Sequence, residues 1–570
     1  MKNKDELYAN IEQIHEQDLT QLQHLIGDYD FARYVLKISR IDEPADTVHS
    51  LLVIRVPQLI AGFPLELLET PVGRTALEDL LTRKMAEEIE KTSGYDADGI
   101  SRRRLYITQP GQKILPRSSL VITEEYVEAR VYARLPVRDG RILGGDLKAL
   151  FFEILPSVVN AALIYCNLDD DEIEEAVNLM NDAEHIRHLL ATRGWISFVA
   201  DQALLNRASD SDLPDYEHAT PFVVDATLAC EVEVPKAGTL RGLGVPTGIT
   251  LILGDAYSGR IELMHAISAG IYNHVSGDGR EMVITNSDAV YVQAEPGRSV
   301  QRVDVSAFVR PMISGVNPAA FTSLHADACA AEAAATIEAL EVGARVLLFD
   351  ESDSAIEFLS RDSRLDGLTA AAERAITPLS ALARRMVDQL GVSLVIAGSS
   401  TLTDFIPAAD TILHIANFKV TDITQQAKAL VTAPETAAPP LDVSALIAKK
   451  RCVVPSSIDA SAGRSDVLIE TAGMYKLCFG RNEIDLQGVD QLADKDQTRT
   501  IGRILYYAKT RYMDEVRSIS EILDAVDQDL STEGLETLTR VLQGDLARPR
   551  RYEIAAALNR LQSLRITRAT

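Results

Sequence analysis

The feature that most constrains this chain is a short apolar run followed by a loop with two glycines at a fixed spacing. Residues 250–253 read Thr-Leu-Ile-Leu and predict a strand, and residues 261–267 can form a helix behind the loop. Gly254 and Gly259 stand at the spacing of a phosphate-binding loop, in which backbone N–H groups surround phosphate oxygens. Taken alone, the same order of elements also fits a purely structural strand–turn–helix.

The two residues that carry the chemistry of such a loop are changed. The pattern places Lys and then Ser or Thr after the second glycine, for the terminal phosphates and for Mg²⁺. Here Arg260 and Ile261 take these positions, and Glu262 adds a negative charge. Arg keeps the positive charge as a wide planar fork, whereas Ile cannot ligate a metal. The predicted nucleotide-binding residues are Gly254, Asp255, Ala256, Tyr257, Ser258, Gly259, Arg260, Ile261 and Glu262.

A second segment, about ninety residues downstream, supports the interpretation of the loop. Residues 344–349 are mostly apolar and end in Asp350 and Glu351. In phosphate-binding-loop NTPases the first acid holds Mg²⁺ and a neighbouring Glu can polarise the attacking water. We therefore predict Asp350 as the metal ligand and Glu351 as the catalytic residue. The alternative is a buried strand whose acids mark its exit to solvent. Residues 331–340, rich in Ala and Glu, predict a helix before this strand.

These motifs resemble those of the predicted ATPases of the ABC class, a family found in bacteria and some eukaryotes, and the resemblance covers nearly the whole chain. The matching stretches are residues 248–254, 271–280, 295–299, 303–306, 338–344, 350–351, 358–362, 479–486 and 545–551. The resemblance implies an α/β P-loop NTPase core of ABC type, a mixed sheet with flanking helices. It also implies an α+β N-terminal domain, a mainly helical C-terminal domain, and ATP and Mg²⁺ as ligands.

The chain departs from this family at functional positions. Where members carry a Ser-Gly-Ser signature turn, this chain has Cys329, Ala330 and Ala331. In ABC dimers that turn lies at a helix N-terminus and binds the γ-phosphate of the nucleotide held by the other subunit. Residues 40–46 also differ from a longer motif of the family that contains Gly and Pro. Losing one preorganised group of an active site costs roughly 10²–10³ in rate, and here several are altered.

We therefore expect a protein that binds ATP but hydrolyses it weakly or not at all, and that acts as a binding or regulatory subunit. Because a kinetoplastid member of the family works in mitochondrial RNA editing, the alternative is an active ATP hydrolase whose cycle opens and closes an RNA clamp. An ABC dimer combines one subunit's P-loop with the other's signature turn, and both are altered here. Any oligomer, or any complex with a protein partner, is therefore expected to form through the terminal domains without nucleotide.

Composition limits the remaining alternatives. The net charge of −26 disfavours nonspecific nucleic-acid binding, although two clusters remain candidates for a local basic patch. These clusters are Arg102, Arg103 and Arg104, and Arg548, Arg550, Arg551, Arg560 and Arg565. Arginine clusters of this kind more often form a solvated or salt-bridged face of a helix. Five cysteines without C-x-x-C spacing favour free thiols in the cytoplasm, Cys329 among them as a small core residue, and no membrane span is expected.

Changes in pattern along the chain suggest five segments. These are an α+β domain at 1–150, a mainly helical connecting region at 151–235, the ABC-type core at 236–430, a Pro- and Ala-rich linker at 431–440, and a mainly helical domain at 441–570. In the first segment we expect an amphipathic helix within residues 1–26, strands at 31–38 and 50–56, and a hairpin of residues 119–123 with 126–135.

The later segments carry three further expectations. The core should close with strands at 393–397 and 411–415. Many ABC domains place a switch His after the first of these strands, but this chain has Gly398, Ser399 and Ser400 there. His414 is expected to pack within the sheet. Near the C-terminus, a helical stripe is expected to be core: Ile554, Leu558, Leu561 and Leu564.

Overall fold

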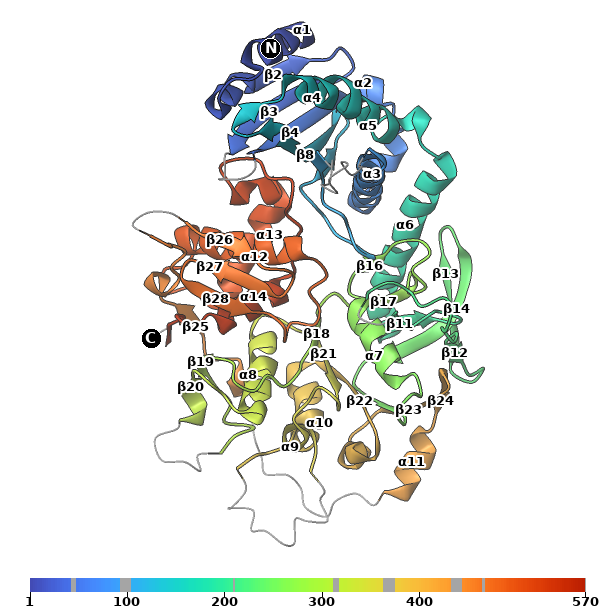
Figure 1. Ribbon diagram of the computed structural model, residues 1–570. Coiled ribbons are helices and arrows are strands. Elements are labelled where there is room, and N and C mark those ends of the chain that lie inside the picture. The colour runs from blue at the N-terminus through green and yellow to red at the C-terminus, as the bar shows by residue number, and fades with distance from the viewer. Residues whose placement is uncertain are drawn as a thin grey trace. The chain divides into compact units, whose positions relative to one another are not determined.

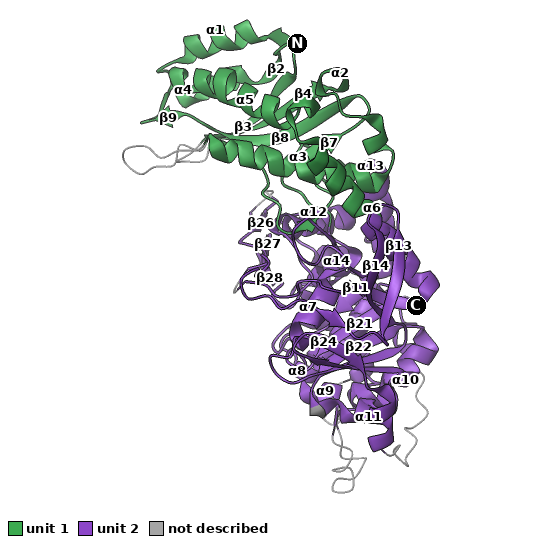
Figure 2. Ribbon diagram, turned by 90° about the vertical axis from the view of Figure 1, so that its right-hand side faces the viewer, with its two compact units in different colours: residues 1–181, 535–548 green, residues 182–534, 549–570 purple. Residues whose placement is uncertain are grey.

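The chain folds into two compact units, which Figure 2 shows in different colours. The computed structural model describes residues 1–42, 48–92, 104–208, 211–310, 317–361, 375–431, 443–463 and 467–568. Unit 1 consists of residues 1–181 and 535–548, and unit 2 consists of residues 182–534 and 549–570. The boundary falls within the long helix α6 (Asp170–Arg193). Nearly all of the predicted linker at 431–440 lies outside the described residues.

Unit 1 is built on a seven-stranded sheet. Its order is β1 (Lys2–Asn3), β2 (Gly27–Asp30), β3 (Val35–Asp42), β4 (Val48–Pro57), β8 (Tyr126–Leu135) and β5 (Leu105–Tyr106), and β7 (Leu120–Ile122) also pairs with β8. Figure 1 labels β2, β3, β4 and β8 of this sheet. Strands β4 and β8 pair antiparallel over ten residues each. The apolar side chains of this sheet share one core with α1 (Lys4–Ile14), α3 (Pro71–Lys91) and α5 (Leu155–Ala162). The predicted β7–β8 hairpin and the strand at 50–56 are confirmed.

Two expectations for unit 1 are wrong in detail. The pattern at 1–26 divides into α1 and a 3-10 helix, η1 (Leu19–Leu25), because Glu16 turns the chain with a φ of 61°. The strand expected at 31–38 begins only at Val35, since Ala32 turns the chain with a φ of 65°. The apolar residues of the pattern are nevertheless buried at Leu7, Ile11, Ile14, Leu22 and Leu25.

Unit 2 contains the sheet that positions the predicted loop. Its order is β12 (Val223–Val224), β24 (Lys419–Asp422), β23 (Thr411–Ala416), β15 (Ile249–Leu253), β22 (Ser393–Gly398), β21 (Val346–Asp350) and β18 (Ala289–Tyr291). The five strands from β23 to β18 run parallel, and β24 is antiparallel to β23. The carboxyl ends of β15, β22 and β21 therefore meet at one edge of the sheet, with β22 in the middle. This is the α/β core that the sequence predicted.

Helices of unit 2 contact this sheet, and β21 is buried along its whole length. Helix α7 (Arg260–Ala269) contacts β21 and β22, and α10 (Leu379–Leu390) contacts β15 and β22. Burial on both faces explains why these strands are almost purely apolar in sequence. A separate four-stranded sheet has the order β13 (Ala229–Val234), β14 (Gly238–Pro246), β11 (Trp195–Ala200) and β17 (Val283–Thr285).

The C-terminal part of unit 2 combines helices with a few short strands. The helices are α12 (Lys495–Arg511), α13 (Ile519–Glu533) and α14 (Arg551–Arg560), and the strands are β25 (Arg451–Val453), β26 (Ile469–Thr471), β27 (Lys476–Phe479), β28 (Asn482–Asp485) and β29 (Ile566–Arg568). The predicted stripe of Ile554, Leu558, Leu561 and Leu564 is buried. Within the described ranges, no helix has the length and apolar character needed to cross a membrane.

Candidate functional site

The predicted phosphate-binding loop joins β15 to α7, and its second glycine is required by the structure. Gly259 has a φ of 95°, and a Cβ at this position would lie 2.8 Å from the ring of Phe418. The Phe418 backbone N–H donates a hydrogen bond of 2.9 Å to the carbonyl of Ser258. The turn between β23 and β24 thus packs directly on the loop. Only Gly satisfies both the positive φ and the close contact at this position.

The first half of the loop has the close backbone approach expected of such a turn. A Cβ on Gly254 would lie 2.5 Å from the Ser258 hydroxyl. Among the described residues, that hydroxyl is buried without a hydrogen-bond partner. Tyr257 has a φ of 62° and a side chain that is 97% exposed, and Ile261 is also exposed. The frame of the loop is therefore formed even though its chemistry is altered.

Arg260, in the position of the phosphate-binding Lys, is held by an ion pair. Its guanidinium donates to both carboxylate oxygens of Asp350, at 3.2 and 3.3 Å. Asp350 is fully buried and Arg260 is 8% exposed. The structure thus brings together two residues that lie ninety positions apart in sequence, at the edge where β15 and β21 end. The predicted phosphate ligand and the predicted metal ligand are therefore bonded to each other.

Further contacts engage one oxygen of the Asp350 carboxylate. Its Oδ1 also accepts hydrogen bonds from the backbone N–H and the hydroxyl of Ser352. An ABC-class loop normally implies a nucleotide with Mg²⁺, and Mg²⁺ requires oxygen ligands in octahedral geometry. Ile261 offers no hydroxyl here, and Arg260 places a cation on the only carboxylate predicted to hold the metal. These residues do not fit Mg²⁺. A phosphate fits better, because the Ser258 hydroxyl and the Arg260 Nε remain without partners among the described residues.

Glu351 is only partly buried and is oriented by the strand between the two motifs. Its carboxylate accepts a hydrogen bond of 2.6 Å from the Ser399 backbone N–H and one of 3.3 Å from the Ser399 hydroxyl. Burial alone would raise the pKa of Glu351. Hydrogen bonds from Thr401 and Ser399 and the charge of Arg260 outweigh that effect and lower the pKa below its ordinary value. Glu351 is therefore ionised at neutral pH.

His414 is exposed, so the expectation that it packs within the sheet is wrong. It lies opposite Leu253 in the parallel pairing of β23 with β15. There it lines a cavity of about 190 Å³ together with Gly254, Asp255 and Ser399. The alternation of buried and exposed residues along β23 turns this side chain away from the core. A titratable group therefore borders the first half of the loop.

The signature-like turn opens helix α8 (Ala328–Glu341), and an acidic side chain caps the helix there. The Asp327 carboxylate caps the helix by accepting from the Ala330 N–H at 3.1 Å. Ala330 and Ala331 are buried. Cys329 is half-buried, less than expected of a core residue, and burial and nearby acids raise the pKa of its thiol to about 11. The Asp327 carboxylate occupies one backbone donor of the helix N-terminus, and its negative charge disfavours a phosphate there.

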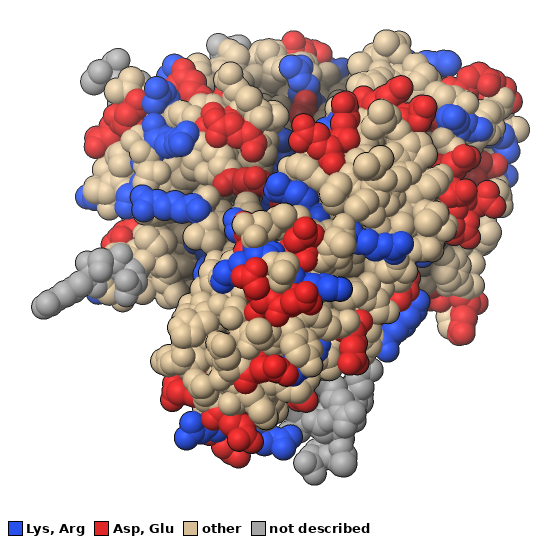
Figure 3. All heavy atoms as spheres, turned by 90° about the horizontal axis from the view of Figure 1, so that it is seen from above, with Lys and Arg blue, Asp and Glu red and all other residues tan. Residues whose placement is uncertain are grey.

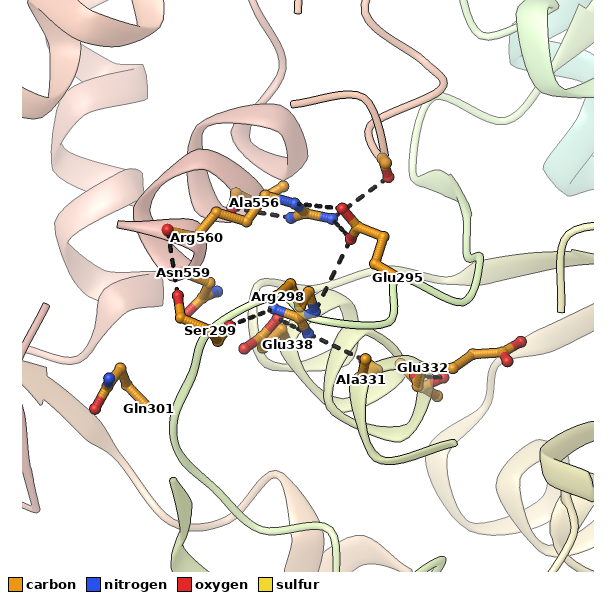
Figure 4. A network of polar contacts seen from close by, with 12 residues as sticks. Glu295, Arg298, Ser299, Gln301, Ala331, Glu332, Glu338, Ala556, Asn559 and Arg560 are labelled. Atoms are coloured by element: carbon orange, nitrogen blue, oxygen red, sulfur yellow. Dashed lines mark hydrogen bonds and ion pairs between the residues drawn. The ribbon is translucent and has the colours of Figure 1, made fainter. Parts of the chain in front are cut away.

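A buried network that the sequence did not predict holds α8 in place (Figure 4). Arg298 donates to the carbonyl of Ala331 at 3.1 Å and to the Glu338 carboxylate at 2.8 Å. Glu295, three residues earlier, pairs with Arg560 on α14. Glu332 is fully buried and accepts the Ala355 N–H at 2.7 Å, which ties α8 to the segment after β21. The sequence marks residues 295–299 only through their resemblance to a family, and the residue types there carry no signal for this structural role.

Comparison with known protein families agrees with this fold. A family model of the P-loop domain of ABC-class ATPases matches residues 169–448. A model of the N-terminal region of ATPases of the ABC class matches residues 4–166. The chain belongs to the ABC-class ATPase family. A model of the MRB1590 C-terminal domain matches residues 468–567 of this ABC-class ATPase.

The chain is also similar to a protein of an archaeon. An uncharacterized protein of Methanocaldococcus jannaschii is 23% identical over 256 residues, which cover 43% of this chain and 56% of the relative. The chain thus spans little more than half the length of that relative.

Proposed function

We propose that this ABC-class ATPase binds nucleotide weakly, without Mg²⁺, and acts as a binding or regulatory subunit with little or no hydrolysis. The observation that carries the proposal is the buried ion pair between Arg260 and Asp350. A productive site would need a cation free to meet the terminal phosphates and a carboxylate free to meet the metal. In this chain each of these groups neutralises the other.

The energetics of the ion pair support weak binding. Removing one partner of a buried ion pair typically costs about 3–5 kcal/mol, because the other charge stays buried and uncompensated. A Mg²⁺–nucleotide complex would have to separate Arg260 from Asp350 and offset that cost by new contacts. A nucleotide without metal can instead use the backbone N–H groups of the glycine loop and leave the pair intact. Binding that does not require Mg²⁺ is therefore expected.

Glu351 favours a second candidate function, slow ATP hydrolysis. An ionised, half-buried carboxylate beside the loop is the group that would polarise an attacking water. Under this alternative the chain turns over ATP, and the turnover depends on Glu351. The two candidates differ in one measurable quantity, the rate of ATP hydrolysis that Glu351→Gln abolishes.

The charge distribution favours a protein partner over an RNA clamp. On the face drawn in Figure 3, Lys and Arg side chains lie interspersed with Asp and Glu side chains. Three of the candidate C-terminal arginines are engaged by acids: Arg550 by Glu553, Arg551 by Asp524 and Arg560 by Glu295. In the other cluster Arg104 lies 3.7 Å from Asp146, and Arg102 and Arg103 are outside the described residues. Paired arginines contribute little to phosphate-backbone binding, which depends on free cations.

Steady-state ATP hydrolysis by the purified chain, with Glu351→Gln as the matched control, tests the proposal. We expect a rate far below the ordinary enzymatic range of about 1 s⁻¹ or more, and no difference between the two proteins. A rate in that range, lost in Glu351→Gln, would show that the chain is an active hydrolase and would overturn the proposal.

A further inference from the structure

Unit 1 contains a pocket that the family relationship does not explain. Its cavity of about 440 Å³ lies between the start of α1, the β2–β3 turn, and the segment that leads into α5. A cavity of this size is within the range of small-molecule sites, which are mainly apolar with a few polar groups. Its lining is Lys4, Phe31, Arg33, Tyr34, Phe152, Pro156, Ser157, Val159, Asn160 and Ile164.

Aromatic rings form one wall of this pocket. Phe31 and Tyr34 stack with their centroids 5.0 Å apart and their planes 12° apart. Phe152 lies 5.6 Å from Phe31 and makes an edge contact with Tyr8. Phe31 and Phe152 are only half-buried, so their rings remain accessible. Half-buried rings that are held by contacts with one another offer flat faces on which a planar ligand can stack.

The backbone that presents these rings is unusual at two points. Phe152 lies in a five-residue π-helix, Leu150–Ile154, between α4 (Gly144–Ala149) and α5. Such π-turns are rare and occur frequently at functional sites. Ala32, between Phe31 and Arg33, is a non-glycine residue with a φ of 65°. Both departures aim side chains at the same cavity.

Two cations line the pocket, and none of its lining residues is acidic. Arg33 donates to the side-chain oxygen of Asn160 at 2.7 Å. Within the part of the chain that the structure describes, neither Arg33 nor Lys4 pairs with a carboxylate. The charged residues of the lining are thus both basic, in a chain that carries 83 acidic and 57 basic residues. Two exposed cations without acidic partners favour an anionic ligand.

The wall also contains an unsatisfied hydroxyl. Tyr34 is 5% exposed, and among the described residues its hydroxyl has no hydrogen-bond partner. A buried polar group without a partner costs roughly 1–3 kcal/mol. A polar ligand atom that reached this hydroxyl would remove that cost. Burial raises the pKa of Tyr34 well above its usual range, so the hydroxyl stays a neutral donor.

We propose that this pocket binds a small anion that carries a flat aromatic ring, of the nucleoside monophosphate class. The ring stacks on Phe31 and Phe152, and Lys4 and Arg33 bind the anionic group. The pocket lies within unit 1, whereas the glycine loop lies in unit 2, so it is a site separate from the one described above.

Calorimetry of the full chain with AMP, without Mg²⁺, tests this site. We expect AMP to bind with a dissociation constant below about 1 mM. Adenosine lacks the anion and ribose 5-phosphate lacks the ring, so each should bind at least about tenfold more weakly than AMP, a loss of about 1.4 kcal/mol. Lys4→Gln combined with Arg33→Gln should weaken AMP binding at least about tenfold. Phe31→Leu, which keeps an apolar side chain but removes the ring, should weaken it about fivefold or more.

Two control variants locate the binding event. Arg138→Gln removes an exposed cation of unit 1 outside the pocket and should leave AMP affinity unchanged. Ile261→Asp places a carboxylate at an exposed position of the glycine loop, where any nucleotide binding is proposed to be weak, so the AMP binding that the pocket of unit 1 contributes should remain. The proposal is overturned if wild type shows no AMP binding, or if Ile261→Asp abolishes binding while the pocket variants retain it. Binding of a single-stranded oligonucleotide without binding of AMP would equally overturn it.

Discussion

At the scale of single residues, the contact between Arg260 and Asp350 determines what the glycine loop can do. The guanidinium occupies the place of the phosphate-binding Lys and covers the carboxylate that would meet the metal. The same contact makes both residues important for stability, because each is buried only as part of the pair. A loop that usually serves catalysis is here also a structural contact between α7 and β21.

This dual role leads to a stability prediction. Arg260→Met leaves Asp350 buried without its cation, so the free energy of unfolding should fall by about 3–5 kcal/mol. Adding Asp350→Asn should recover part of the loss, because the uncompensated charge is removed. Trp195, the only Trp of the chain, lies in unit 2, and its fluorescence during urea denaturation measures the change.

An exposed ion pair provides the matched control. Lys476 and Glu483 are in contact at 2.8 Å on the C-terminal strands, with both side chains about half exposed. Lys476→Met should leave the unfolding transition nearly unchanged, since exposed pairs contribute little. If Arg260→Met proved no more damaging than Lys476→Met, the buried pair would not have the role assigned to it.

Glu332 gives a prediction for the pH dependence of stability. Burial raises its pKa to about 8, so the folded state keeps a proton that the unfolded state, with an ordinary pKa, has released. Stability is therefore lost as pH rises from the unfolded value toward pH 8. Glu332→Gln keeps an acceptor for the Ala355 N–H and has no proton to lose. Across that range its stability relative to wild type should rise by up to about 1.4 kcal/mol per pH unit.

Urea denaturation of both proteins from pH 4.5 to pH 8.5 measures this difference. A constant difference between wild type and Glu332→Gln over the whole range would mean that Glu332 is ionised in the folded state. The comparison is internal, because all other titrating groups are shared by the two proteins.

Some site residues could be predicted from the sequence and others could not, for a physical reason. Gly254, Gly259 and the Asp350–Glu351 pair are set by local spacing at strand ends. The two motifs come together because β15 and β21 both pair with β22, which follows both of them in sequence but lies between them in the sheet. The partners of Glu351 and Arg298 lie 48 and 40 residues away in sequence, respectively. The chemistry assigned to the loop residues remains a prediction.

At the scale of elements, helix α8 is the part most tied to its surroundings. Arg298 connects its first turn to Glu338, and Glu332 connects it to the segment after β21. Near the end of α8, Glu341 pairs with Arg451 of β25 at 2.7 Å. The helix that would carry a signature turn is thus fixed by buried polar contacts at several points.

These contacts predict that α8 depends on Arg298. Arg298→Met leaves Glu338 buried without its cation and removes the donor to the Ala331 carbonyl. Amide hydrogen exchange should become faster across α8, by about tenfold or more if the local opening free energy falls by about 1.4 kcal/mol. Arg345→Met, at an exposed pair with Asp288, is the control and should not change α8. Equal exchange in both variants would contradict the role of Arg298.

The elements themselves were largely predictable where apolar runs were long. Strands β15, β21, β22 and β23 follow such runs, and parallel strands buried on both faces need them. The errors fall where a single residue turns the chain, at Glu16 and Ala32, since positive φ at a non-glycine residue leaves no clear trace in composition. The exposure of His414 could not be predicted, because it depends on which neighbouring elements cover β23.

At the scale of the whole molecule, the altered loop and the altered turn make nucleotide-driven dimer closure unfavourable. Each composite site of a homodimer would combine a P-loop whose Arg260 is bonded to Asp350 with a signature turn capped by Asp327. We predict that the oligomeric state does not change with ATP, with or without Mg²⁺. Light scattering at several protein concentrations measures this, and a monomer that dimerises only on ATP addition would contradict it.

The grouping of residues into units could not be foreseen from composition. Residues 535–548 belong to unit 1, where Tyr132 donates to Asp545 at 2.9 Å and Arg130 pairs with Glu536. Nothing in the local pattern of this short segment distinguishes it from the helices beside it. The association of sequence-distant segments depends on contacts that only the folded chain contains.

The Mg²⁺ dependence of ATP binding tests the central claim most directly. Calorimetry would compare wild type with the double variant Arg260→Lys and Ile261→Ser, which restores the usual loop residues. We predict that Mg²⁺ leaves the weak ATP affinity of wild type unchanged. In the double variant, Mg²⁺ should tighten ATP binding by about tenfold or more. If wild type itself bound ATP more tightly with Mg²⁺, Asp350 would be available to the metal, and the Arg260–Asp350 pair would not close the site.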